Sequence, residues 1–65
     1  MKISTAQLNR RQAELGLTRK AVAELAGISR QTMSTIAQRG TCEPTTLGKI
    51  AKALGVDPAD LIKED

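Results

Sequence analysis

Residues 30–38, RQTMSTIAQ, hold a run of side chains that donate and accept hydrogen bonds. If the segment is an α-helix, its polar side chains form one continuous face without an acidic residue, and Met33, Ile36 and Ala37 lie on the opposite side. In the major groove of DNA, Arg can bind guanine and Gln can bind adenine through two hydrogen bonds each, and Ser and Thr make shorter contacts. The pattern therefore predicts a base-reading face made of Arg30, Gln31, Ser34, Thr35 and Gln38.

Taken alone, this pattern also fits a solvated helix whose polar residues serve solubility. The preceding residues favour the base-reading interpretation, because residues 18–27, TRKAVAELAG, predict a short helix that ends at a glycine turn. Ser29 then caps the next helix. Two short helices joined by such a turn form a helix-turn-helix, whose second helix enters the major groove. In the first of these helices, the side chains expected to face the core are Ala21, Val22, Leu25 and Ala26.

Helix starts and stops along the chain predict an all-α fold. The starts are marked by a Ser, Thr or Asp cap between apolar residues, at Ser4, Thr18, Ser29 and Asp57. The stops are marked by a glycine after each helical run, at Gly16, Gly27, Gly40 and Gly55. We also expect Gln7 to complete a capping box with Ser4, and Thr45 or Thr46 to cap the fourth helix. The five predicted helices cover residues 5–15, 19–26, 30–38, 46–54 and 58–63.

The composition limits the class of protein. The chain has 65 residues, one cysteine, no histidine and no aromatic residue. We therefore expect a single domain over residues 1–65 that is stabilised by aliphatic packing, with no disulfide, metal, cofactor or small-molecule ligand. Residues 1–42 contain seven basic and two acidic residues, whereas residues 43–65 contain three and five, so a surface that binds a polyanion belongs to the first part. No apolar segment is long enough to span a membrane, and the lone cysteine fits the reducing cytoplasm.

Other candidate sites have simpler explanations. Cys42 has no histidine to activate it, and the glutamate beside it would raise its pKa, which favours an incidental loop cysteine over a nucleophile or redox switch. Asp57 and Asp60 fit the first turn of a helix better than an acid–base pair. In the first helix, Arg11 or Gln12 stands where an apolar residue is expected, and we expect one of them to lay its aliphatic stem on the core. No group of residues indicates catalysis.

Two long segments carry a family resemblance, LGLTRKAVAELAGISRQTMSTI at residues 15–36 and PTTLGKIAKALGVDPADLI at residues 44–62. They resemble the lambda-repressor/Cro-like (Xre-type) DNA-binding domains. The first is similar to the helix-turn-helix of that family, here at about residues 18–38, and the second to the fourth and fifth helices that close its compact five-helix fold. The resemblance covers roughly residues 8–63, nearly the whole chain.

The resemblance implies roles for particular residues. The base-reading face matches family positions that reach base edges, most directly at Arg30, Gln31 and Thr35. Arg19 stands where the family usually has glutamine, at the start of the second helix, which implies a charged clamp on a DNA phosphate. The loop at residues 39–41 matches positions that contact the DNA backbone. By resemblance or by position beside the recognition helix, the residues expected to contact phosphates are Arg10, Arg11, Thr18, Arg19, Lys20, Ser29, Arg39 and Thr41.

These observations predict a sequence-specific protein that binds double-stranded DNA, a transcription regulator of the repressor kind. We expect it in the cytoplasm of a bacterial or phage system, on the nucleoid when it is bound to DNA. One module contacts a short half-site, so we expect a palindromic operator and a weak homodimer. Because the chain ends soon after the fifth helix, that dimer is expected to use the last helices, the 40–45 loop or the DNA itself. The alternative is a protein-interaction module, such as a toxin-neutralising antitoxin that regulates itself by binding DNA; neither is an enzyme.

Overall fold

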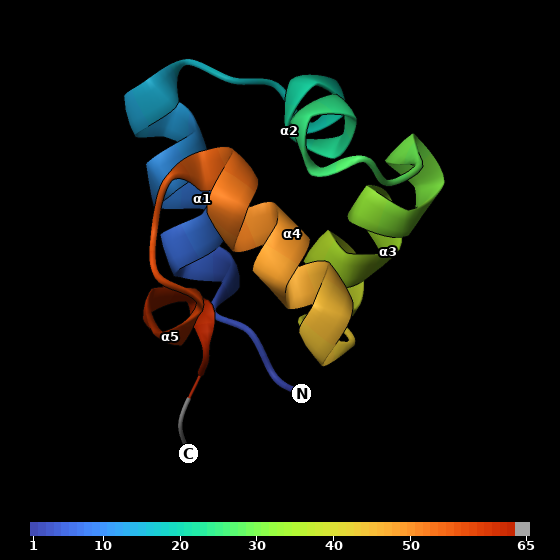
Figure 1. Cartoon of the computed structure of the whole chain (residues 1–65), viewed down its shortest axis with the longest axis vertical. Coiled ribbons are helices and arrows are strands. Elements are labelled where there is room, and N and C mark those ends of the chain that lie inside the picture. The colour runs from blue at the N-terminus through green and yellow to red at the C-terminus, as the bar shows by residue number, and fades with distance from the viewer. Residues whose placement is uncertain (64–65) are drawn as a thin grey trace.

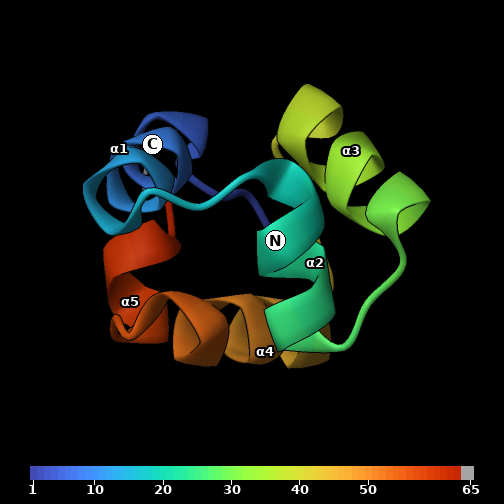
Figure 2. The ribbon, with the colours of Figure 1, turned by 90° about the horizontal axis from the view of Figure 1, so that it is seen from above.

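Five α-helices make up the regular structure of residues 1–63, the part of the chain that the computed structural model describes. They are α1 (Thr5–Leu15), α2 (Arg19–Ala26), α3 (Arg30–Arg39), α4 (Pro44–Leu54) and α5 (Pro58–Leu61). In the view of Figure 1, α4 lies between α1 and α5 on one side and α2 and α3 on the other. Seen from above, α2 lies over α4, and α3 lies at the outer edge of the molecule (Figure 2). The predicted all-α fold with five helices is confirmed.

The predicted capping residues begin four of these helices. The hydroxyl oxygens of Ser4, Thr18 and Ser29 each accept a hydrogen bond from the backbone amide three residues later, at 3.2, 3.1 and 3.0 Å. The carboxylate of Asp57 accepts one from the amide two residues later, at 2.8 Å. Each bond satisfies an amide that has no partner inside its own helix, so these short polar residues determine where each helix starts.

The N-terminal segment replaces two expected local features with contacts to the other end of the chain. The capping box expected between Ser4 and Gln7 is only half formed, because the Ser4 amide donates to the carbonyl of Leu61 at 2.7 Å. α5 ends two residues earlier than predicted, since Ile62 is extended and pairs with Ile3 in an isolated antiparallel bridge. Ile3 is buried in the core, so this pairing removes an apolar side chain from water.

α4 begins two residues earlier than predicted. Pro44 occupies its first turn and Glu43 is the N-cap residue, without a side-chain hydrogen bond, so neither Thr45 nor Thr46 caps this helix. Proline already has the φ angle of a helix, and its missing amide costs nothing at the first position, which explains the earlier start. α3 continues one residue further than predicted, to Arg39.

Aliphatic side chains from all five helices and from the N-terminal segment form the core. Its buried members are Ile3, Leu8, Val22, Ala23, Ala26, Met33, Ile36, Leu47, Ile50, Ala51, Leu54 and Leu61. The expectation that Leu25 faces the core is wrong, because Leu25 is 61% exposed, whereas Ala23 is 2% exposed. α2 packs against both α3 and α4. The small side chains of Ala23 and Ala26 fit between these neighbours, and this orientation turns Leu25 outward.

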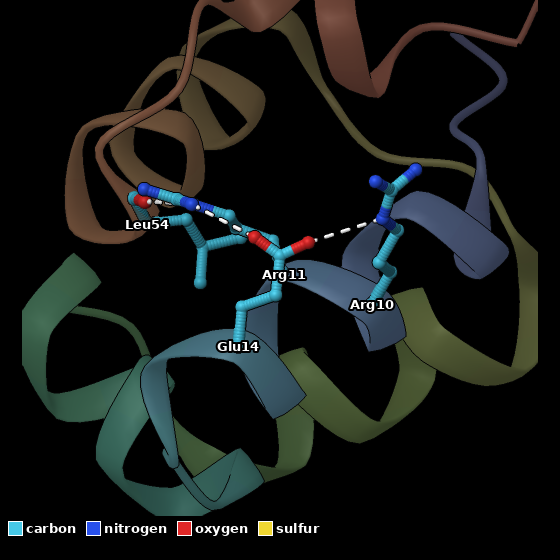
Figure 3. A network of polar contacts seen from close by, with 4 residues as sticks. All are labelled: Arg10, Arg11, Glu14 and Leu54. Atoms are coloured by element: carbon cyan, nitrogen blue, oxygen red, sulfur yellow. Dashed lines mark hydrogen bonds and ion pairs between the residues drawn. The ribbon is translucent and has the colours of Figure 1, made fainter.

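Arg11 and Gln12, the two polar residues expected on the inner side of α1, are both half-buried, and the one bonded to α4 is Arg11. Its side chain is 34% exposed, and its Nε donates to the carbonyl of Leu54, the last residue of α4, at 3.0 Å. Its Nη1 donates to Glu14 at 3.0 Å, and Arg10 binds the other oxygen of the same carboxylate (Figure 3). The guanidinium of Arg11 therefore provides a positively charged donor at the C-terminus of α4, where the helix dipole is negative.

Candidate nucleic-acid interface

A turn of three residues sets the direction of α3 relative to α2. Gly27 has a φ of +72°, a left-handed conformation that glycine adopts without steric cost, and its amide donates to Glu24 at 3.2 Å. The amide of Ile28 donates to the carbonyl of Ala23 at 3.0 Å, which closes the end of α2. Ser29 then caps α3. Both helices of the predicted helix-turn-helix therefore have fixed ends.

α3 has one buried side and one exposed polar side. Met33 and Ile36 are 0% and 5% exposed, and they hold the helix against the core. No acidic residue lies anywhere in α3. Figure 2 shows α3 at the edge of the fold, with its outer side turned away from the other helices. The structure places all of the predicted base-contacting residues among the exposed positions of this helix, namely Arg30, Gln31, Ser34, Thr35 and Gln38.

Hydroxyl contacts order the side chains in the first two turns of α3. The Ser29 oxygen accepts from the amide of Thr32, and the two hydroxyl oxygens are 2.7 Å apart. One turn later, the hydroxyl of Thr35 donates to the backbone carbonyl of Gln31 at 3.0 Å. Sequence patterns had placed these residues on the recognition helix but could not show which of their protons are already in use.

The N-terminus of α2 carries three of the residues predicted to contact phosphates. Thr18 is the N-cap, and its hydroxyl oxygen accepts from Ala21 at 3.1 Å. Arg19 donates through Nη2 to the side-chain oxygen of Asn9 in α1, and its Nη1 is buried without a hydrogen-bond partner in the described part of the chain. Lys20 is exposed. Two cations and the positive end of the helix dipole together favour an anion at this position.

The loop that follows α3 is held in place by the N-terminal segment, which the sequence analysis did not predict. The carbonyl of Gly40 accepts from the amide of Ile3 at 2.8 Å, and the amide of Cys42 donates to the carbonyl of Met1 at 3.0 Å. These bonds flank Thr41, so the predicted phosphate-contacting loop has a defined backbone. No local sequence signal reveals this contact, since it joins segments that lie far apart in the chain.

An open cleft beside this loop adds two basic residues to the surface. It is lined by Gln38, Arg39 and Thr41 at the end of α3, and by Lys2 and Lys63 from the two ends of the described chain. Arg39 and Thr41 are exposed, as a contact with phosphates requires. The basic surface therefore extends past α3 to positions that the sequence analysis did not single out.

Arg10 and Arg11, also predicted to contact phosphates, face a different part of the fold. They lie with Glu14 along a surface shared with α5. Hydrogen bonds from Arg11, and then from Arg10, hold the pKa of Glu14 below its ordinary value. The Arg10 side chain is 72% exposed, whereas Arg11 is also bound to the carbonyl of Leu54. Their contacts are thus with α1 itself and with the end of α4.

Among residues 1–63 there is no group of three or more His, Cys, Asp or Glu side chains that could hold a metal ion. Burial raises the pKa of the half-buried Cys42 thiol, so less of it is present as the reactive thiolate. Asp57 serves as the N-cap of α5, as predicted. None of the helices described here has the length and apolar character needed to cross a membrane.

Comparison with known proteins identifies the family. A family model described as a Cro/C1-type helix-turn-helix DNA-binding domain matches residues 7–64. The chain belongs to this family. The match takes in all five helices from the first turn of α1 onward. A search of the curated proteins finds no match.

Two solved structures share the fold of this Cro/C1-type domain. They are native PhpD with cadmium atoms, and PhpD with cadmium complexed with hydroethylphosphonate. Each has a TM-score of 0.83 and 23% sequence identity over 98% of this chain. The domain spans only 14% of the PhpD chain, and at this identity the likeness concerns the fold alone.

Membership in the Cro/C1-type family confirms the resemblance drawn from the sequence and makes the chain a DNA-binding domain. Its helix-turn-helix consists of α2, the turn at Gly27 and α3. The family is defined by DNA binding rather than by catalysis. Exposure and existing hydrogen bonds determine which side chains of this domain are available to contact bases or phosphates.

Proposed function

We propose that this Cro/C1-type domain is a sequence-specific regulator of transcription, a repressor that inserts α3 into the major groove of its operator. The observation that carries the proposal is the exposed side of α3, which is polar, free of acidic residues and fixed at both ends. A face without carboxylates can approach DNA phosphates without repulsion. Occupying a promoter is sufficient for repression, so the mechanism needs no further activity.

We assign base contacts to the exposed residues of α3, and we propose that the main contacts are made by its N-terminal end. Arg30 and Gln31 stand in the first turn, where recognition helices of this architecture meet base edges. Arg30 has the paired donors that match guanine, and Gln31 has the donor and acceptor that match adenine. Ser34, Thr35 and Gln38 continue the same side of the helix and contact the neighbouring bases.

Phosphate contacts are proposed at the N-termini of α2 and α3, at the C-terminal end of α3 and the loop that follows it, and at Arg10 of α1. The capping hydroxyl of Thr18 accepts a hydrogen bond from an amide and keeps its own proton, which can be donated to a phosphate oxygen. The hydroxyls of Ser29 and Thr32 share one hydrogen bond, so one of the two keeps a proton for such a contact. We leave Arg11 out of this set, because its guanidinium is held by the carbonyl of Leu54, whereas the exposed Arg10 can turn from Glu14 to a phosphate. The proposed phosphate contacts are Arg10, Thr18, Arg19, Lys20, Ser29, Arg39 and Thr41.

We also propose that residues 1–65 act as a single domain and that two copies bind a palindromic operator as a weak homodimer. We place this binding in the cytoplasm of a bacterial or phage system. One recognition helix reads only a few base pairs, and a second copy doubles the site. Four cations in the proposed phosphate set predict that the logarithm of affinity falls by about 3.6 per tenfold rise in salt for each protomer.

Selection of bound sites from random duplex DNA tests the proposal. We expect enrichment of a palindrome whose half-sites lie about one helical turn apart, with guanine and adenine among the selected bases. The salt dependence of affinity is then measured on the selected duplex. No enrichment, together with no duplex binding at low salt, would contradict the regulator and leave the protein-interaction module as the alternative.

A further inference from the structure

The hydroxyl of Thr35 is already committed inside α3. It lies 3.0 Å from the backbone carbonyl of Gln31, and because a carbonyl can only accept, the Thr35 hydroxyl must be the donor. Its single proton is therefore not available to a base. The side chain is nevertheless on the exposed side of the recognition helix.

Thr35 differs in this respect from Thr18, the capping residue of α2. The oxygen of Thr18 accepts from a backbone amide and keeps its proton for an outside acceptor. The Thr35 oxygen is instead drawn back against the backbone of the preceding turn. The Thr35 oxygen can still accept a hydrogen bond from outside the helix but cannot donate one, and the methyl group is the part of the side chain left for an apolar contact.

We propose that Thr35 is a specificity-determining residue that selects thymine through contact between its methyl group and the 5-methyl group of the base. Thymine carries the one methyl group that the four bases present in the major groove, so an apolar contact there distinguishes thymine from the other three. The inference rests on the proposed insertion of α3 into that groove. It gives Thr35 a different chemistry from Gln31, which reads by hydrogen bonds.

The position of Thr35 on the helix suits this role. It follows Gln31 by one turn and is joined to it by the hydroxyl–carbonyl bond, so the two side chains lie next to each other on the exposed side. The bond also restricts rotation about the Cα–Cβ axis of Thr35. A methyl group held in one position loses little freedom when it meets the base.

Two variants of Thr35 separate the methyl group from the hydroxyl. Thr35→Val keeps a methyl group and removes the hydroxyl, whereas Thr35→Ser keeps the hydroxyl and removes the methyl group. Each is compared with the wild type on the selected operator and on copies in which single thymines are replaced by deoxyuridine, which lacks the 5-methyl group. Circular dichroism establishes that both variants retain the wild-type helix content.

At one thymine of each half-site, wild type and Thr35→Val should bind the thymine duplex about fourfold more tightly than the deoxyuridine duplex, the factor expected for one buried methyl group. Thr35→Ser should bind both duplexes equally, at the weaker level. The inference is overturned if Thr35→Ser keeps the preference and Thr35→Val loses it, or if no deoxyuridine substitution weakens wild-type binding. Those results would not contradict the proposed regulator function. Failure of the wild type to select any duplex would contradict both that function and the methyl contact of Thr35.

Discussion

Replacing Arg11 with methionine should destabilise the domain while leaving its DNA binding intact. The substitution keeps an unbranched side chain and removes the guanidinium that donates to the carbonyl of Leu54 at 3.0 Å. Leu54 is buried, so its carbonyl loses a charged donor with little water to replace it. Hydrogen bonds to charged groups contribute about 1.5–3 kcal/mol, and the 34% exposure of Arg11 places it near the lower limit, about 1.5 kcal/mol. For a domain of this size the loss corresponds to a fall in Tm of about 6–12 °C.

Thermal unfolding followed by circular dichroism measures this effect. Arg10→Met is the matched control, because Arg10 binds the same carboxylate from an exposed position and has no bond to α4; it should change Tm far less. The salt dependence of DNA affinity should be unchanged in Arg11→Met. An unchanged Tm together with a shallower salt dependence would refute the structural role and return Arg11 to the phosphate-contacting set.

Three further predictions concern the recognition helix, the turn and the pH dependence. Gln31→Ala should weaken binding to the selected duplex by about 1–3 kcal/mol and leave binding to a scrambled duplex nearly unchanged, as measured by fluorescence anisotropy; an equal loss on both would show that Gln31 does not read bases. Gly27→Ala should lower the free energy of unfolding by about 1–2 kcal/mol, because a φ of +72° strains any residue with a Cβ although no atom lies within 4 Å of it. Gly48→Ala, inside α4 and equally uncrowded, should instead stabilise the domain by about 0.5–1 kcal/mol. Urea titration measures both variants, and a loss of stability in Gly48→Ala would refute this reasoning. Because the pKa of Glu14 is lowered from its ordinary value of 4.5, its carboxylate stabilises the domain at neutral pH, and this contribution is lost as the pH falls below 4.5 and through the lowered pKa. Glu14→Gln should flatten the pH dependence of the free energy of unfolding in that range, and an unchanged pH dependence would contradict this role.

Features that depend on neighbouring residues could be predicted from the sequence. The helix starts at Ser4, Thr18, Ser29 and Asp57 are local, since each cap bonds an amide two or three residues away. The turn at Gly27 is equally local. These signals were sufficient for the starts of four helices and for the exposed side of α3, whose polar residues repeat with the period of the helix.

Features that depend on distant parts of the chain could not be predicted in this way. Leu25 has the hydrophobicity of a core residue, and its outward position follows from the contacts of α2 with both α3 and α4. The bonds from Ile3 to Gly40 and from Ser4 to Leu61 join the N-terminal segment to two other regions, and no periodicity encodes them. The early start of α4 is a different case, because the helix-starting property of Pro44 was available in the sequence.

The candidate site divides in the same manner. Residues that lie on one helix face, such as Gln31 and Thr35, could be grouped from spacing alone. Which groups are still free to bind could not, because the bonds of Thr35 to Gln31 and of Arg11 to Leu54 depend on the folded backbone. These two bonds alter the proposed chemistry most. The bond to Gln31 is the reason that we propose a methyl contact for Thr35, and the bond to Leu54 is the reason that we leave Arg11 out of the proposed phosphate contacts.

The most direct test of the central claim is to map which surface of the domain meets DNA. Backbone amide chemical shifts are recorded by NMR while the selected duplex is added to the labelled protein. The largest changes should occur in α3, at the N-terminus of α2 and in the loop at residues 39–41, with little change along α5. Large changes along α1 and α5, with α3 unaffected, would contradict the proposal that α3 reads the operator.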